Sequence, residues 1–297
     1  MRWGPHARLV AVADSFAVRF DAVRRVRGPL TWGLDPSGDI LDEWGLGDTP
    51  DGLERFIDIV LPVAAETVGL IKPQAAFYER HGWRGIRALS RLIDEARSAG
   101  LLIVLDAKRG DVGSTNQAYA EAYLGPDAPM RADALTVHPY LGVGAMVPFI
   151  DRAAESGCCL LIVTRSSNIE GRSVQASTDR DGRSVEQVLL DTIGELNAEL
   201  APGEIGPIGA VIGPTHMDPR LDLAAPNALY LAPGVGWQGA SPDDVASVFG
   251  SCQHRVFPSA SRSLLASPDP GRLRDDIEEL AAEFRQLLVD RPPHRTT

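Results

Sequence analysis

The sequence has few cysteines and no long apolar run. Its 297 residues include 3 cysteines, Cys158, Cys159 and Cys252, and none of them stands in a CxxC pair. Three thiols cannot pair fully, and their spacing is not that of a zinc site, so we expect free, buried thiols in a reducing compartment. No apolar stretch approaches the roughly 20 residues that a membrane-spanning helix needs. The apolar stretch before Asp14 is also too short for a signal peptide, so we expect a soluble, cytoplasmic protein.

Positive charge is scarce as well. The chain carries 29 Lys+Arg against 40 Asp+Glu, a formal net charge of −11. A chain this acidic is a poor ligand for nucleic acid or an anionic membrane, and neither is expected as a partner. A small anionic substrate is still compatible with this balance, because a local cluster of cations can outweigh the global sign.

Lysine is almost absent. The chain has only two, Lys72 and Lys108, and every other basic residue among the 29 is an arginine. A codon preference for arginine explains the scarcity but not the positions, since both lysines follow apolar, strand-like runs. Arginine stays protonated near neutral pH, whereas lysine can give up its proton when its pKa is tuned. These positions therefore indicate two functional lysines.

Apolar strand-like runs alternate with helical segments along the chain. An amphipathic helix at 14–27 comes first. The predicted strands are 30–34, 68–71, 101–105, 134–137, 159–163, 208–212, 229–231 and 255–257. The predicted helices that follow them are 51–67, 78–99, 115–124, 145–155, 184–200, 219–223, 242–249 and 270–289. Strand–helix alternation predicts a parallel sheet.

Eight such units in a chain of this length predict an α/β fold, namely a (β/α)8 TIM barrel with an N-terminal helix. A doubly wound sheet is the alternative, although it usually has fewer strands. No linker divides the chain, so residues 1–297 are expected to form a single domain with loose termini at 1–13 and 291–297. The segment 165–183 is polar and rich in turns, and it is too long for an ordinary strand-to-helix loop, so we expect it to act like a lid.

The stretch 101–115, LLIVLDAKRGDVGST, is the most informative part of the sequence. Five apolar residues typical of a strand buried on both faces lead into Asp106, Lys108 and Asp111. Residues two apart on a strand point the same way, so Asp106 and Lys108 are expected to share a face. Ser114 and Thr115 are predicted N-cap residues of the next helix. Such a concentration of charge is unsuited to a core and indicates a site.

Other polar residues also follow the predicted strands, where the site of a barrel lies. Each has an ordinary structural explanation when it is taken alone: a turn cap for Asp35, a structural histidine for His138, a neutralised pair for Asp106 and Lys108. Together, however, they favour a site. The positions at the strand ends are Asp35, Lys72, Asp106, Lys108, His138, Ser166, Ser167, Pro233, Gly234, Ser261 and Arg262.

A glycine-rich stretch, APGVGWQGAS at 232–241, has the spacing GxGxxG. It does not fit a dinucleotide-binding fold, because it follows the seventh predicted strand and no acidic residue stands about twenty residues further on. After strands seven and eight of a barrel, such loops commonly bind phosphate through backbone N–H groups and a helix N-terminus. Gln238 and Arg262 are expected to complete this phosphate site.

From the residues alone, the sequence predicts a barrel enzyme that acts on a small phosphorylated molecule. It contains no HxH or HExxH motif, and no carboxylate ends the strand at 68–71, so no metal site and no cofactor are expected. The reaction itself stays open, because a lysine can act as a general acid or form a Schiff base.

Several motifs, in order, resemble those of the orotidine 5′-phosphate decarboxylase family. The segment from Asp106 to Asp111, with Val112 and Thr115, resembles the family signature DxKxxD(I/V)xxT. The other matching segments are 33–36 (GLDP), 71–73 (IKP), 137–138 (VH), 233–239 (PGVGWQG) and 259–262 (SASR). The resemblance runs from about residue 14 to 288, and the length and the segment 165–183 resemble the longer bacterial (type 2) branch.

This resemblance implies decarboxylation of orotidine 5′-phosphate to UMP in pyrimidine biosynthesis, without metal or cofactor. Lys108 would donate a proton to C6, Asp106 would lie against the substrate carboxylate, and Lys72 with Asp35 would reach the ribose. The resemblance also implies a homodimer with shared active sites, in which Asp111, Val112 and Thr115 act in the partner's site. The remaining substrate contacts that it implies are Ser167 to the pyrimidine, and Pro233, Gln238 and Arg262 to the phosphate.

One alternative concerns a single site residue, and three concern the function. After Ser167 and Asn168 the family often has proline, whereas this chain has Ile169 and Glu170, so Ser166 remains an alternative to Ser167 as the residue that contacts the base. A metal-dependent sugar-phosphate decarboxylase shares the signature, but it needs a carboxylate where Lys72 stands. A Schiff-base aldolase and a non-catalytic nucleotide-binding barrel are the other readings that the residues allow.

Overall fold

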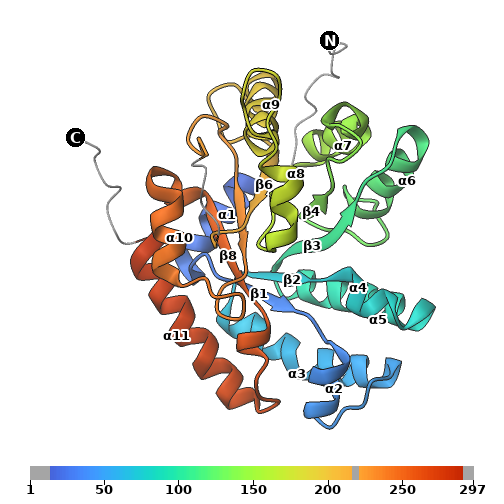
Figure 1. Ribbon diagram of the computed structural model, residues 1–297. Helices are drawn as coiled ribbons and strands as arrows, with labels where there is room; N and C mark the ends of the chain where they lie inside the picture. Colours follow the sequence, from blue (N-terminus) through green and yellow to red (C-terminus); the bar gives the residue numbers. More distant parts are fainter. Residues whose placement is uncertain (1–13, 216–220, 290–297) are drawn as a thin grey trace.

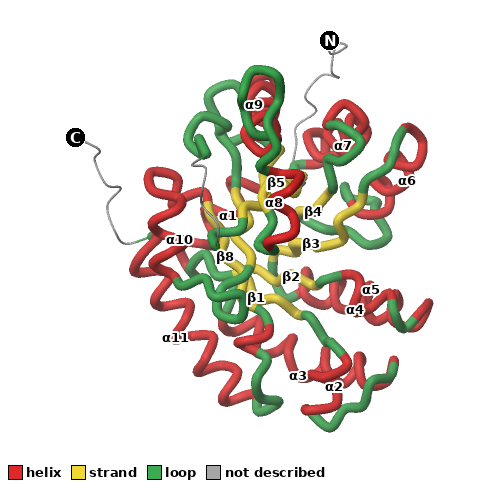
Figure 2. Tube along the Cα trace, viewed as in Figure 1, coloured by secondary structure: helices red, strands yellow, loops and turns green. Residues whose placement is uncertain are grey.

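The computed structural model describes residues 14–215 and 221–289 and forms a closed barrel of eight parallel strands. Each strand pairs with the next along the chain, and β8 pairs with β1 to close the ring. The predicted TIM barrel with an N-terminal helix is confirmed. Figure 1 shows the order of the elements, and Figure 2 shows the strands enclosed by helices.

The strands are short and lie close to the predicted runs. They are β1 (Thr31–Leu34), β2 (Leu70–Pro73), β3 (Leu102–Arg109), β4 (Ala134–Val137), β5 (Cys159–Arg165), β6 (Ile208–Ile212), β7 (Tyr230–Pro233) and β8 (Val256–Ala260). The α-helices are α1 (Phe16–Arg27), α2 (Gly38–Glu43), α3 (Pro50–Thr67), α4 (Ala75–Glu79), α5 (Gly82–Ser98), α6 (Gly113–Tyr123), α7 (Val147–Ser156), α8 (Arg172–Gln175), α9 (Val185–Leu200), α10 (Pro242–Phe249) and α11 (Pro270–Leu288). Short 3-10 helices η1 (Val143–Met146), η2 (Ile169–Gly171), η3 (Gly250–Arg255) and η4 (Arg262–Leu264) lie between them.

Local sequence signals explain where several helices begin. The side chains of Thr49, Ser184 and Asp269 accept hydrogen bonds from the first turns of α3, α9 and α11. A proline stands in the first turn of α3 and of α11, where its missing N–H costs no intrahelical bond. These starts agree with the predicted helices at 51–67, 184–200 and 270–289.

The core has two layers. The inner cluster fills the barrel with side chains from the strands, and Phe16 and Phe20 of α1 complete it. Both rings contact Phe257 of β8 edge to face, with centroids 5.9 and 5.3 Å apart. Helix α1 therefore covers one end of the barrel interior with aromatic rings, which are favoured in this geometry.

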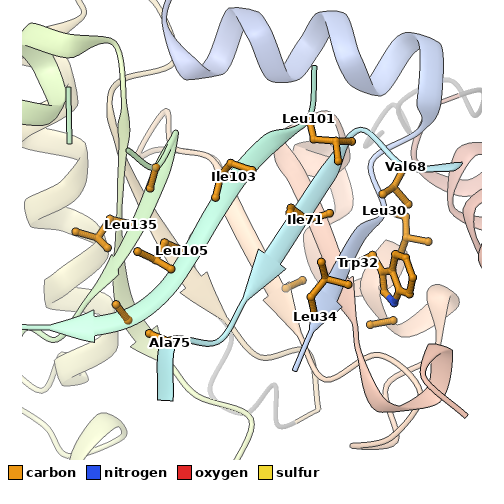
Figure 3. Close-up of a cluster of buried hydrophobic side chains, with 14 of the residues drawn as sticks. Leu30, Trp32, Leu34, Val68, Ile71, Ala75, Leu101, Ile103, Leu105 and Leu135 are labelled. Atoms are coloured by element: carbon orange, nitrogen blue, oxygen red, sulfur yellow. The ribbon is translucent and has the colours of Figure 1, made fainter. Parts of the chain in front are cut away.

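The outer cluster lies between the strands and the surrounding helices. Figure 3 shows part of it, with Trp32 of β1, Ile71 of β2, and Ile103 and Leu105 of β3. On β3, Ile103 and Leu105 belong to this layer, whereas Leu102 and Val104 belong to the inner one. Alternate residues of a strand point to opposite faces, so one strand can contribute to both layers.

Three predictions of local structure are wrong. The predicted helix 78–99 is interrupted, because α4 ends at Glu79 and α5 begins only at Gly82, whose φ is 64°. Ser114 and Thr115 do not cap α6, which begins at Gly113 after Val112 and has no side-chain cap. The predicted helix 219–223 falls partly outside the described residues, and residues 221–223 are not helical. The predicted loose termini, 1–13 and 291–297, lie outside the described residues.

Candidate active site

The charged residues of β2 and β3 lie on the inner face of the barrel. Leu70, Leu102 and Val104 belong to the inner core cluster. Counting in steps of two places Lys72 above Leu70, and Asp106 and Lys108 above Val104. The interior of the barrel therefore changes from apolar to charged at the carboxyl ends of these strands, where barrel enzymes have their sites.

Two lysines and two aspartates form a compact cluster there. Lys108 Nζ lies 2.6 Å from Asp106 Oδ1. Lys72 Nζ lies 3.4 Å from Asp106 Oδ2 and 3.6 Å from Asp35 Oδ1. The prediction that Asp106 and Lys108 share a face is confirmed. The two lysines of the chain thus meet at a single carboxylate, although 36 positions separate them in the sequence.

Burial and neighbouring charges act in opposite directions on this cluster. Burial raises the pKa of Asp106, but Lys72 and Lys108 lower it more, to about 2. Burial lowers the pKa of Lys72, and Asp35 and Asp106 outweigh that effect, so the pKa of Lys72 rises. Asp106 and Lys72 are therefore both charged at neutral pH. A buried array of alternating charges is tolerated because each charge is paired.

Two uncharged partners of Asp106 were not predicted. The hydroxyl group of Thr136 on β4 donates to Asp106 Oδ1 at 2.8 Å. The side-chain amide of Gln74 donates to Asp106 Oδ2 at 3.3 Å, and the backbone N–H of Gln74 donates to Asp35 Oδ1 at 3.2 Å. Thr136 lies two residues after Ala134 of the inner core cluster, so strand alternation could have identified it. Gln74 carries no comparable signal, because it follows the strand.

We expect Asp106→Asn to show how strongly the cluster depends on this carboxylate. Because the pKa of Asp106 in the folded chain is about 2, against an ordinary value of 3.8, its charge stabilises the fold at pH values above about 4. This stabilisation disappears as the pH falls through the folded pKa. Chemical unfolding at pH 7 should show a loss of about 2 kcal/mol for the variant. The difference from wild type should shrink between pH 4 and pH 2.

The control for this comparison is Asp94→Asn, which changes an exposed aspartate on α5. Its free energy of unfolding should stay within about 0.5 kcal/mol of wild type across the same range. A difference between wild type and Asp106→Asn that is the same at pH 7 and pH 3 would contradict the linkage.

The second half of the site comes from the loops that follow the later strands. Ser167 follows β5, and its hydroxyl group donates to Gln238 Oε1 at 2.8 Å. The Arg262 guanidinium lies 5.0 Å from the ring centroid of Trp237. The loops after β5, β7 and β8 are therefore linked by side-chain contacts. Ser166 instead bonds to Gln175 within its own segment, which distinguishes it from Ser167.

The loop after β7 has a backbone conformation that favours glycine at three positions. Gly234, Gly236 and Gly239 all have positive φ values. A Cβ atom on Gly234 would lie 2.5 Å from Gln238 Oε1, so glycine lets this side chain fold back over the loop. The N-terminus of α10 is a weak anion site, because Ser241 already caps it and Asp243 and Asp244 stand in its first turn. The predicted phosphate site thus depends on the loop and on Arg262.

Asp111, Val112 and Thr115 stand apart from the charged cluster. In the part of the chain that the structure describes, Asp111 forms no ion pair with Lys72 or Lys108. Its carboxylate accepts from the Val112 N–H at 2.8 Å. Val112 is 55% exposed, and Thr115 is exposed as well. The structure therefore brings Asp35, Lys72, Asp106 and Lys108 together within one chain. It leaves Val112 and Thr115 exposed and Asp111 partly exposed.

The segment 165–183 is anchored more firmly than a free loop. Arg165 is the last residue of β5 and is buried, and its guanidinium pairs in two places with Glu186 of α9. Beyond it, η2 and α8 give the segment helical turns, and Figure 1 draws α8 in front of the strands. The ordered backbone differs from the irregular loop that the sequence suggested.

Two kinds of feature are absent from residues 14–215 and 221–289. No group of three or more His, Cys, Asp or Glu side chains is arranged to hold a metal ion. No helix in these ranges has the length and apolar character needed to cross a membrane.

The fold and the site define a class, namely (β/α)8-barrel proteins with a compensated lysine–aspartate cluster at the carboxyl ends of the first strands. Residues 29–273 match the family described as Orotidine 5′-phosphate decarboxylase / HUMPS family. The chain belongs to this family, as the order of its motifs predicted.

Similar proteins cover nearly the whole chain. Orotidine 5′-phosphate decarboxylase of Salinispora arenicola is 46% identical over 277 residues, which are 93% of this chain and 99% of that protein. The protein of the same name from Streptomyces coelicolor is 45% identical over 278 residues, with the same coverage. A crystal structure from Streptomyces avermitilis, assigned as orotidine 5′-phosphate decarboxylase, matches with a TM-score of 0.88 and 43% identity. That match covers 93% of this chain and 97% of the other.

Proposed function

We propose that this chain decarboxylates orotidine 5′-phosphate to UMP. The observation that carries the proposal is the convergence of both lysines on Asp106 at the carboxyl ends of the strands. The names of the similar proteins support the choice of substrate. Removal of CO2 from a pyrimidine ring leaves an electron pair on carbon, and an ammonium group already in place stabilises that charge.

Lys108 is the proton donor in this mechanism. Its side chain is 38% exposed on the open side of the cluster, while Asp106 holds its ammonium group at 2.6 Å. The bond between C6 and the carboxylate breaks, CO2 leaves, and the electron pair stays on C6. A proton moves from Lys108 Nζ to C6 to form UMP, and the neutral amine takes a proton back from water.

Asp106 and Lys72 prepare this step. The Asp106 carboxylate stays ionised and directs Lys108, and it would lie beside the carboxylate of the substrate. Lys72 is buried between Asp35 and Asp106 and pairs with both, so that together with Lys108 it offsets the two aspartates. With Asp35, it would reach the ribose hydroxyl groups. The array needs little rearrangement during the reaction, which is the condition for electrostatic catalysis.

The opposite side of the barrel opening would hold the base and the phosphate. Ser167 would contact the pyrimidine, and Gln238, Arg262 and the backbone at Pro233 the phosphate. Stacking on Trp237 limits the motion of the Arg262 guanidinium but leaves the N–H groups along its edge free for phosphate oxygens. The segment 165–183, which carries Ser167 at its start, would close over the bound nucleotide.

The proposal includes a homodimer with shared active sites. Val112 and Thr115 are exposed, and Asp111 is partly exposed and forms no ion pair with either lysine among the described residues, so all three are available to a partner's site. A cytoplasmic location remains part of this proposal. Sedimentation of the purified chain would test the dimer.

The decisive measurement is turnover of orotidine 5′-phosphate, followed by the loss of its ultraviolet absorbance. We expect full conversion to UMP and CO2 by the purified wild-type chain. Binding of UMP measured in parallel separates a catalyst from a nucleotide-binding barrel. Tight binding of UMP without turnover of orotidine 5′-phosphate would contradict the proposed function.

A second measurement separates this reaction from the metal-dependent decarboxylation of sugar phosphates. Strand β2 ends in Lys72 and Pro73, so it offers an ammonium group where that chemistry needs a carboxylate ligand. We expect the rate in excess EDTA to equal the rate without it. Loss of activity in EDTA that Mg²⁺ restores would favour the metal-dependent alternative.

A further inference from the structure

We infer that Thr136 is a positioning residue for the proposed decarboxylation, one whose hydroxyl group holds the backbone of Lys108 and the carboxylate of Asp106 in a single geometry. The inference rests on the proposed function for its kinetic consequences. Its consequences for the geometry of Lys108 and Asp106 depend on the fold alone. Thr136 would not touch the substrate, because it is completely buried behind Asp106.

The regular pairing of β3 with β4 is interrupted beside the charged cluster. Leu105 pairs with Leu135, and the next pair joins Arg109 to Val137. The three residues of β3 between these pairs, 106–108, therefore face the single residue Thr136 on β4. A bulge of this kind re-aims a side chain and leaves backbone groups without their usual partners.

Lys108 has an unusual backbone within this bulge. Its φ is 45°, and among the described residues other than glycine only Asn227 shares a positive φ. A side chain such as lysine rarely adopts this left-handed conformation. It persists only where the surrounding structure holds it, and such positions gather at functional sites.

The hydroxyl group of Thr136 replaces the backbone hydrogen-bond partner that the bulge takes away from the Lys108 N–H. It accepts a hydrogen bond from the Lys108 N–H at 3.0 Å and donates its own proton to Asp106 Oδ1 at 2.8 Å. The same Oδ1 atom accepts from Lys108 Nζ at 2.6 Å. Three residues thus form a closed ring of hydrogen bonds through both the backbone and the side chain of Lys108.

This ring determines where the ammonium group of Lys108 lies. One contact orients the backbone from which the side chain extends, and the other orients the carboxylate to which the ammonium group binds. Because Thr136 is fully buried, water cannot easily replace its hydroxyl group. Loss of the hydroxyl should therefore move the proton donor without removing any group that binds the substrate.

The test compares Thr136→Val, which keeps the shape and removes the hydroxyl, with Thr136→Ser, which keeps the hydroxyl. We expect Thr136→Val to lower kcat about 10- to 100-fold, as the loss of hydrogen bonds to charged groups would. KM should stay within about threefold of wild type, because substrate-binding groups are untouched. Thr136→Ser should retain kcat within about threefold.

Thr31→Val is the matched control. Thr31 is also fully buried in a barrel strand, and its hydroxyl group has no hydrogen-bond partner among the described residues. The same change there should leave kcat and KM as in wild type. If Thr136→Val does not fold, Thr136→Ala takes its place. Comparing Thr136→Ala with Thr136→Ser again shows the effect of removing the hydroxyl group.

Three outcomes would overturn the inference: a kcat for Thr136→Val equal to that of Thr136→Ser, a rise in KM alone, or an equal loss in Thr31→Val. A wild-type chain that does not turn over orotidine 5′-phosphate would count against the proposed function instead. A crystal structure of Thr136→Val then decides the inference. We expect Lys108 to leave the left-handed region or to separate from Asp106, and an unchanged geometry would overturn it.

Discussion

Replacement of Lys108 by alanine is expected to abolish nearly all decarboxylation of orotidine 5′-phosphate. The change removes the proton donor, which contributes typically 10²–10⁴-fold. It also removes the cation that stabilises charge on C6, and a group of this kind is worth about 10²–10³-fold. The two effects belong to one side chain and are not independent, so we expect kcat to fall by at least about 10⁴-fold.

The measurement is kcat by the absorbance assay, together with the affinity for UMP. UMP lacks the substrate carboxylate and needs no proton, so its binding should change much less than kcat. Arg87→Ala is a suitable control, because Arg87 is an exposed cation on α5 whose contact with Glu54 is 3.4 Å long. Its rate should equal that of wild type. A Lys108→Ala variant that kept near-full rate would refute the assigned proton donor.

Replacement of Glu186 by glutamine is expected to lower the free energy of unfolding more than any other single substitution proposed above. Glu186 and Arg165 are only 3% and 4% exposed, and the carboxylate accepts from Arg165 Nε at 2.7 Å and from a second guanidinium nitrogen. When one partner of a buried pair is neutralised, the remaining charge stays without full compensation. Such changes typically cost about 3–5 kcal/mol.

Chemical unfolding of three variants tests this expectation. Glu95→Gln alters a partly exposed contact of Arg91 and should cost less than about 1 kcal/mol. The double variant Arg165→Met with Glu186→Leu should be more stable than Glu186→Gln, because apolar pairs often replace buried ion pairs at little cost. Equal losses for Glu186→Gln and Glu95→Gln would contradict the importance of the buried pair.

The same pair has a consequence for the proposed closure over the nucleotide. Arg165 ends β5, Ser167 follows two residues later, and Glu186 stands in the first turn of α9. The pair therefore fixes both ends of the segment that carries Ser167. Glu186→Gln should weaken UMP binding as well as stability, and a change in stability alone would restrict the pair to a structural role.

Much of the fold follows from local patterns. Eight apolar runs alternating with helices predicted the barrel, since an apolar strand that leads into a helix must lie in a parallel sheet. The break before α5 was not predicted, because the apolar periodicity of 78–99 continues across it and only the positive φ of Gly82 interrupts the helix. The predicted start of α6 was also wrong, since the conformation of the residues before the helix depends on the bulge at the end of β3.

The charged cluster was predicted in part. Strand alternation placed Asp106 with Lys108. Because the carboxyl ends of the strands lie at the same end of a barrel, Lys72 was expected in the same site. Thr136 and Gln74 were missed, because a threonine on a strand and a glutamine after one are ordinary residues until a carboxylate from another strand reaches them. The phosphate site was expected to use a helix N-terminus, which Ser241 already caps.

The sequence by itself determined which residue types stand at which strand ends, because burial follows a period of two along a strand and the barrel aligns those ends. It thereby identified the class of fold, the family and the two lysines. Only the tertiary structure decided the left-handed backbone of Lys108, its hydrogen bonds through Thr136 and the absence of an ion pair between Asp111 and either lysine among the described residues. These features arise from the register between β3 and β4, and that register is set by contacts between strands and not by the residues of either strand alone.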